Sequence, residues 1–278
     1  MVGVDKTAEG KKPGLLFVNS KITKPDQLSD EQYTRWYEDT HIVDIFKTSG
    51  IKEAARWKAL DPEQDRPYLA LYPLEDLDFL NSDEFKAIPV HDDKLPGSGQ
   101  IFTLADFDTR YYAFEQLYEP KETKSGGSTR VQEEQSGQQL IAADQPDFVI
   151  ACGFTPSDEA EYDDWYRAQH LREVSEITGW RKTGRYTLTY ARQNRKPAGD
   201  SDIAAPPRFL TLVGLSEGLS SDPLGHADSV ALQHYFDGAS LPETELAKSG
   251  EEERAKRNMA AMKETQIAVF KKLSQFIK

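Results

Sequence analysis

Cysteine is almost absent from this chain, since Cys152 is the single cysteine among 278 residues. One cysteine excludes an intramolecular disulfide, and the sequence has no Asn-x-Ser/Thr glycosylation acceptor. No stretch approaches the roughly 20 apolar residues that span a bilayer. The polar residues 1–14 lack the apolar core of a secretory signal. We therefore expect a cytoplasmic protein that makes no membrane contact.

Several motifs that identify common sites are also missing. The sequence contains no glycine-rich dinucleotide or phosphate-binding motif, no G-x-S-x-G nucleophile motif and no H-E-x-x-H metal motif. Five histidines and one cysteine make a structural zinc site implausible. A His-x-x-carboxylate pair could contribute to a metal site, but no third ligand is evident. We expect neither a metal nor a cofactor.

Positive charge is scarce. Lysine and arginine total 34 against 47 aspartates and glutamates, which gives a formal net charge of −13. Nucleic acids and anionic lipids both require clustered cationic surface, so neither is an expected partner. A small-molecule partner remains compatible with this balance, because a local pocket can differ in charge from the whole chain.

An internal repeat is the most informative feature that is present. Residues 33–57 and 162–186 align without a gap at a constant offset of 129. The matching pairs are Tyr33 with Tyr162, Trp36 with Trp165, Tyr37 with Tyr166, His41 with His170, Asp44 with Glu173, Gly50 with Gly179, Arg56 with Arg185, and Trp57 with Tyr186. Two copies are too few for a solenoid, so the chain resembles a fused dimer of similar halves.

Each half predicts the element order β-α-β-β-α-β from its apolar periodicity and turn residues. In the first half we expect strands at 14–18, 53–60, 68–72 and 100–117, with helices from about residue 29 and near residue 82. In the second half we expect strands at 148–152, 180–190, 208–213 and 265–273, with helices at 162–177 and 227–236. This order is the ferredoxin-like arrangement, an antiparallel sheet with both helices on one face.

Local signals predict where these helices begin and end. Ser29 and Gln32 form a capping-box pattern at the start of the first helix. Thr155 followed by Pro156 predicts an N-cap for the corresponding helix of the second half. Gly50 is expected to end the first helix in a left-handed conformation.

The fold class that follows is α+β, with two ferredoxin-like halves forming an intrachain, pseudo-dimeric barrel. One half alone would leave an apolar sheet face uncovered, and a second copy of the sheet covers it. We expect a flexible N-terminus at 1–13, a first half at 14–118, a flexible polar linker at 119–146 and a second half at 147–278. The segment 242–262 is charged enough for an exposed helix.

The repeated Tyr-x-x-Trp-Tyr-x-x-x-His helix, followed by glycine and an arginine–aromatic strand, resembles the dimeric α+β barrel superfamily. It is most similar to EthD-like proteins, in a double-length form like that of some fungal members. The resemblance covers roughly residues 14–117 and 147–273. It implies that small aromatic or polyketide-like molecules bind between sheet and helices. It further implies cofactor-free chemistry, such as that of oxygenases, isomerases, cyclases and decarboxylases.

The candidate catalytic residues lie on the repeated helix. His41 and His170 titrate near neutrality and can therefore accept and return a proton. Asp44 and Glu173, three residues further on, lie within reach to orient each imidazole. The alternative is that each histidine packs against the sheet while its carboxylate faces water. Tyr37 is expected to support a developing enolate or phenolate.

The candidate substrate-binding residues are mostly aromatic or basic: Tyr33, Trp36, Arg56, His91, Tyr162, Trp165, Tyr166 and Arg185. The aromatics either contact a flat ligand or belong to the ordinary core, which is the commoner role at helical spacing. Each arginine either clamps a substrate carboxylate or pairs with an acidic residue. His91 either reaches the mouth of the first pocket or is a solvated loop residue.

The leading functional hypothesis is a cofactor-free lyase or isomerase acting on a small hydroxyaromatic or polyketide-like molecule by decarboxylation, dehydration or enolisation. One alternative is a cofactor-independent monooxygenase of the same superfamily. Another is a non-catalytic binding or carrier protein, because one fold hosts many functions. The sequence leaves open whether both pockets function and whether two chains pair as a homodimer.

Overall fold

The structure is a computed structural model that describes residues 10–122, 128–133, 146–177, 179–194, 205–216 and 251–278. The helix predicted at 227–236 lies outside these residues. Among the described helices, none has the length and apolarity needed to cross a membrane.

The first half follows the predicted element order, with short helical turns added. Its elements are β1 (Gly14–Ile22), α1 (Asp30–Trp36), the π-helical turn η1 (Tyr37–His41), α2 (Ile42–Phe46), β2 (Glu53–Ala59), β3 (Tyr68–Leu74), the 3-10 turn η2 (Leu77–Asn81), α3 (Asp83–Lys86), the 3-10 turn η3 (Ile101–Thr103) and β4 (Ala105–Glu122). The capping box predicted at Ser29 and Gln32 is confirmed, with both reciprocal hydrogen bonds present.

The described part of the second half repeats this succession after a short additional strand. The additional strand, β5 (Ser128–Glu133), lies in the segment between the halves. The elements of the second half are β6 (Phe148–Pro156), α4 (Glu159–Trp165), the π-helical turn η4 (Tyr166–His170), α5 (Leu171–Val174), β7 (Trp180–Gln193), β8 (Phe209–Leu215), α7 (Glu251–Ala260) and β9 (Met262–Ile277). Helix α7 lies within the segment 242–262, for which an exposed helix was predicted.

Eight of the described strands close into an antiparallel barrel in the order β1-β3-β2-β9-β6-β8-β7-β4, and β4 pairs back with β1. Within the first half the order is β4-β1-β3-β2, and within the second it is β9-β6-β8-β7. The seams between the halves are therefore β2 with β9 and β4 with β7. Because the sheet closes on itself, none of these eight strands is left as an open edge.

The barrel interior is an apolar cluster to which both halves contribute. Its buried members are Leu15, Phe17, Ala55, Trp57, Leu69, Leu71, Tyr112, Val149, Ala151, Tyr186, Leu210, Leu212 and Phe270. Successive strand residues point to opposite faces, so the neighbours Leu16 and Val18 of β1 point outward instead. The uncovered sheet face expected of a single half is thus buried against the other half.

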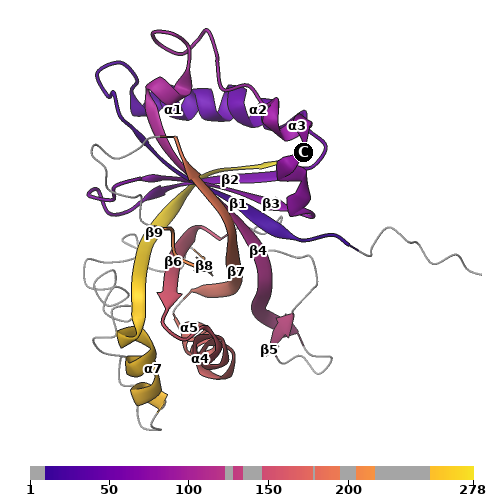
Figure 1. Ribbon diagram of the computed structural model, residues 1–278, viewed down its shortest axis with the longest axis vertical. Helices are drawn as coiled ribbons and strands as arrows, with labels where there is room; N and C mark the ends of the chain where they lie inside the picture. Colours follow the sequence, from indigo (N-terminus) through magenta and orange to yellow (C-terminus); the bar gives the residue numbers. More distant parts are fainter. Residues whose placement is uncertain (1–9, 123–127, 134–145, 178, 195–204, 217–250) are drawn as a thin grey trace, which may run out of the picture.

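Helices cover the outside of the barrel on two opposite sides. Figure 1 shows α1 and α2 at one end of the molecule and α4 and α5 at the other, with the strands between them. On the first side, Tyr33, Trp36 and Ile45 pack on the outer face of the sheet. Tyr162 and Trp165 do the same on the second side. Both layers form because each helix buries the apolar stripe that its three- and four-residue spacing creates.

Three local predictions need correction. Gly50 does not have a positive φ, whereas its repeat partner Gly179 does, at 79°. Gly50 is instead required by packing, since an added Cβ would lie 2.1 Å from the Phe79 ring. Asp158, and not Thr155, caps the second helix, with its side chain accepting from two backbone N–H groups. Pro156 accordingly ends β6.

The segment 119–146, predicted as a linker without structure, contains strand residues at its start. Strand β4 continues to Glu122, and β5 pairs with it antiparallel from Leu117↔Glu133 to Glu122↔Ser128. Ladder hydrogen bonds come from the backbone, so a polar sequence with no apolar alternation can still form a strand.

Candidate active site

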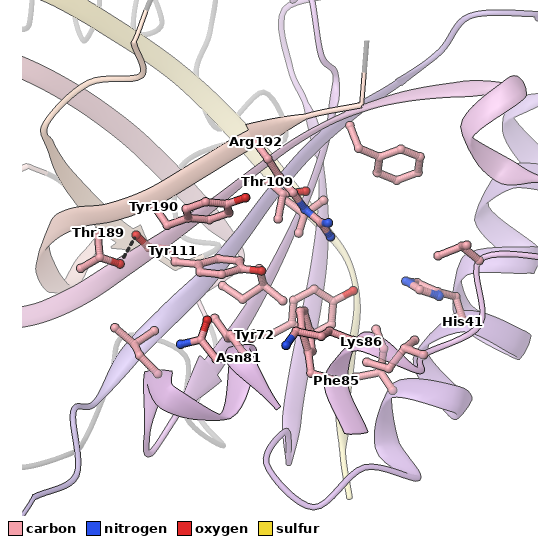
Figure 2. A pocket seen from close by; sticks show the side chains of 18 of the residues that line it. His41, Tyr72, Asn81, Phe85, Lys86, Thr109, Tyr111, Thr189, Tyr190 and Arg192 are labelled. Atoms are coloured by element: carbon pink, nitrogen blue, oxygen red, sulfur yellow. Dashed lines mark hydrogen bonds between the residues drawn. The ribbon is translucent and has the colours of Figure 1, made fainter. Parts of the chain in front are cut away.

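A pocket of about 750 Å³ lies between the first-half helices and the outer face of the barrel. Its walls come from α1, η1 and α2 on one side, from β1, β3 and β4 on another, and from the η2–α3 and η3 segments. The end of β7, from the second half, closes the remaining side. The lining side chains with polar groups include His41, Tyr37, Tyr72, Tyr111, Tyr190, Thr109, Asn81, Lys86 and Arg192. Figure 2 shows His41 on one wall and Tyr111, Tyr190 and Arg192 on the opposite one.

A π-helical turn places the histidine in both halves. The helix widens over Tyr37–His41 and again, 129 residues later, over Tyr166–His170. Such turns interrupt α-helices rarely and are frequent at functional sites. Tyr37 and His41 begin and end the turn, and both line the pocket.

The His41 imidazole is held between two aromatic rings. It stacks on Trp36, with centroids 5.1 Å apart and planes 15° apart, and meets Tyr37 edge-on at 5.1 Å. Burial lowers its pKa from 6.5 to about 4, although Asp44 and a hydrogen bond with the Pro89 backbone act in the opposite direction. Its Nδ1 is buried without a hydrogen-bond partner among the described residues. The ring is therefore neutral near pH 7.

Asp44 does not hydrogen-bond to His41, contrary to the orienting role predicted for it. Its Oδ1 instead accepts from Lys47 Nζ at 2.6 Å. In the second half, Glu176 stands at the position that corresponds to Lys47, so no lysine at this position binds the carboxylate. Glu173, which is also longer than Asp44, turns towards the histidine. Asp44 thus acts on His41 only as a nearby charge.

Two tyrosine hydroxyls form a pair on the pocket wall. The Tyr72 hydroxyl donates to the Tyr37 hydroxyl at 2.9 Å, and both side chains are buried. Burial raises the pKa of both phenols, so they remain protonated at neutral pH. One hydrogen of the pair is used between the two rings, which leaves the other to donate to a ligand oxygen.

Arg56 is committed to a structural contact and does not reach the ligand space. Its Nη1 pairs with Glu38 at 2.9 Å, and its guanidinium lies 4.3 Å from the Tyr37 ring centroid. Ser274 of β9 donates to the same Glu38 carboxylate, so the group joins the two halves at one seam. The alternative in which this arginine pairs with an acidic residue is the one that the structure shows.

The corresponding residues of the second half form a packed network. His170 is 5% exposed, and its Nδ1 lies 3.0 Å from Glu173 Oε2. Gln169 donates to the other oxygen of Glu173 at 2.6 Å. Burial lowers the pKa of His170, so a neutral imidazole donates to an ionised glutamate. Arg185 pairs with Asp163 at 2.9 Å, as Arg56 does with Glu38.

The other predicted binding residues are distributed between core and surface. Tyr33 is buried, with its hydroxyl 2.7 Å from Ser20 Oγ, and lies behind the pocket wall. Trp36 lines the pocket, whereas Tyr162, Trp165 and Tyr166 belong to the buried cluster of the second side. His91 is exposed in a loop that pairs with Gln100 and does not line this pocket.

Sequence reasoning missed several lining residues of the far wall. Tyr111 of β4 and Tyr190 of β7 form a cross-strand pair with ring centroids 5.0 Å apart. Arg192 lies two residues further along β7, on the same face. In the sequence, these residues were indicated only by the length of the two strands and by their apolar and aromatic content. Both strands extend beyond the core of the sheet. Their partnership across the halves depends on the barrel seam and has no short-range signature.

The burial of His41 predicts a pH-dependent stability. The unfolded histidine, with a pKa near 6.5, binds a proton more readily than the folded one, with a pKa near 4. The contribution to stability is therefore complete above about pH 6.5 and is lost as the pH falls towards about 4. When the pH is lowered from about 7 to about 5, the free energy of unfolding of the wild-type protein should fall by about 2 kcal/mol more than that of His41→Gln. Urea titrations of both proteins measure this; equal losses would show that the imidazole is solvated.

Comparisons with known proteins agree with this architecture. A solved anthrone oxidase-like protein superposes with a TM-score of 0.52 at 13% identity, covering 97% of this chain and 94% of that one. A putative monooxygenase from Fusobacterium nucleatum gives a TM-score of 0.50 at 10% identity, covering 96% and 95% of the two chains. These likenesses show that the chain shares its overall fold, the closed antiparallel barrel with helices outside it, with both solved proteins.

Sequence comparison is more specific. No family model matches the chain. Core atranone cluster (CAC) protein 1 of Stachybotrys chlorohalonatus is 30% identical over 165 residues, which are 58% of this chain and 68% of that protein. The chain therefore belongs to the family of core atranone cluster protein 1.

Proposed function

We propose that the chain is a cofactor-free lyase or isomerase that moves a proton on a small hydroxyaromatic or polyketide-like molecule bound in the first-half pocket. One observation carries this proposal: a neutral imidazole and a pair of protonated phenols line the same aromatic cavity. The enzyme names of the structural neighbours and the cluster name of the sequence relative are compatible with it.

The proposed step is removal of a proton from a carbon beside a carbonyl group. His41 accepts that proton, since its side chain lines the cavity and is uncharged at neutral pH. The Tyr37–Tyr72 pair donates its remaining hydrogen to the enolate oxygen as negative charge develops there. In enolisation, His41 returns the proton to another atom of the substrate, and in dehydration it gives the proton to the departing hydroxide. Decarboxylation forms the same kind of anion by loss of CO₂, and that anion then takes a proton from the solvent.

The size and walls of the cavity support a flat ligand. About 750 Å³ lies within the range of sites that enclose most of a small organic molecule. Trp36, Phe85 and Phe107 offer aromatic surface on three sides. Desolvation by these walls strengthens the hydrogen bonds made to an anion in the cavity.

The two halves are proposed to be a fused pseudo-dimer of ferredoxin-like units, in the tandem form that the resemblance to EthD-like proteins implies. Their identical strand order and the two π-helical turns at an offset of 129 support this. In that scheme the first half has kept an open pocket. Among the described residues of the second half, His170 is buried in the network with Glu173, which supports assigning catalysis to His41 and not to His170.

The test is hydrogen–deuterium exchange at the carbon beside the carbonyl group of a ketone that is fused to an aromatic ring. β-Tetralone in deuterated buffer, followed by proton NMR, reports enolisation directly. We expect exchange to accelerate in proportion to protein concentration. Oxygen consumption with an aromatic enol would favour the monooxygenase alternative, since it begins with the same anion. Tight binding with no exchange and no oxygen uptake would indicate a carrier.

A further inference from the structure

Lys86 and Arg192 are two cations that line the pocket. Among the described residues, the side chains of Lys86 and Arg192 take part in no ion pair or hydrogen bond. Asp78 is the one carboxylate among the lining residues, and Lys12 lies 3.5 Å from it. The pocket therefore carries an uncompensated positive charge in a chain whose net charge is −13.

The two cations line the cavity from different elements. Lys86 is at the end of α3, and Arg192 is near the end of β7. In Figure 2 the Tyr111 ring lies below Arg192 and above Lys86, and His41 lies on the opposite side of the view from Tyr111. Burial raises the pKa of Tyr111, while the positive charge of Arg192 acts against this rise.

Strand geometry holds Arg192 in this position. Arg192 pairs with Thr109 of β4, and Tyr190 pairs with Tyr111, so all four side chains lie on the pocket face of the seam. Thr189 donates to the Tyr111 carbonyl at 2.9 Å, where the register shifts. The second half thus contributes a cation, from the paired strand β7, to a pocket whose base belongs to the first half.

We infer that this pocket takes an aromatic carboxylate, whose acid group is bound by Arg192 and Lys86 while its ring lies towards His41. A guanidinium and an ammonium on two sides suit a carboxylate, with the Tyr111 hydroxyl as a third donor. An acidic protein repels an anionic ligand at long range, so recognition depends on this local charge. The inference rests on the proposed function for the pocket, and it adds the charge and orientation of the substrate.

The experiment compares anthracene carboxylate with its methyl ester, which has the same ring and no charge. Binding is measured by isothermal titration at neutral pH and low salt. We expect wild-type protein to bind the acid about 10-fold more tightly than the ester, and Arg192→Gln and Lys86→Gln each to weaken acid binding about 3- to 10-fold. In both variants the affinity for the ester should change less than about twofold. Added salt should reduce the difference in affinity between the acid and the ester in the wild-type protein.

Arg257→Gln and Lys263→Gln are matched controls, because they remove the same charges from exposed positions away from the pocket. Both should leave acid and ester binding unchanged. Equal affinity for acid and ester in the wild type, or equal effects of the pocket and control variants, would overturn the inference. If the inference is overturned in this way but the protein still accelerates hydrogen–deuterium exchange of β-tetralone, the proposed function is retained. Acid preference without any exchange leaves the inference standing and removes the proposed reaction.

Discussion

Replacing Trp57 with alanine is expected to lower the free energy of unfolding by about 3–5 kcal/mol. The Trp57 side chain is 0% exposed in the barrel interior, where it belongs to the same cluster as Leu212 and Phe270 of the second half. Its removal leaves a cavity whose walls are strands hydrogen-bonded on both sides, and such walls cannot collapse inward. Chemical denaturation followed by circular dichroism measures the loss.

Trp57→Phe is the matched control. It keeps most of the apolar volume and removes an indole N–H that has no hydrogen-bond partner among the described residues. We expect a loss below about 1.5 kcal/mol for this variant. Because the interior is shared by both halves, both variants should unfold in a single transition. A separate transition for each half, or a loss below about 1 kcal/mol for Trp57→Ala, would contradict a common core.

The second large effect is expected at His41. His41→Gln should slow the protein-dependent exchange of β-tetralone by about 10²- to 10⁴-fold, the usual contribution of a positioned general base. The glutamine keeps a polar group in the pocket but cannot accept the proton. Exchange rates are compared at equal concentrations of folded protein, as verified by circular dichroism.

His170→Asn tests whether the duplicated histidine takes part. Asparagine retains an N–H donor near the place of Nδ1 and so preserves the contact with Glu173. We expect an exchange rate within about threefold of the wild type, since the histidine belongs to a buried network on the other side of the barrel. A loss equal to that of His41→Gln would mean that both halves are catalytic.

The repeat was the part of the fold most accessible from sequence. Equal residues at a constant offset, Trp36 with Trp165 and His41 with His170, pointed to two similar units whose strands the structure shows in the same order. Short apolar runs bounded by turn residues, such as 14–18, identified strands, because such strands have one face in the barrel and the other under a helix. Helix starts followed from short-range side-chain chemistry, as the Ser29 capping box shows.

The site was only partly predictable, because its decisive contacts are not local. Asp44 has the spacing to reach His41, but Lys47 is equally near and binds it more strongly. The π-helical turn that presents His41 has no simple sequence signal. Arg192 joins the pocket only because β7 crosses the seam beside β4, a relation that spans 83 residues between paired Thr109 and Arg192.

Histidine-selective NMR tests the central claim most directly, because the chain has only five histidines and the His41→Gln variant assigns one signal. With His41 buried in a ligand pocket, its imidazole should titrate near pH 4, and its signal should shift when an aromatic ligand such as anthracene carboxylate is added. The His170 signal should stay in place. A His41 signal that titrates near pH 6.5 and ignores the ligand would contradict the account.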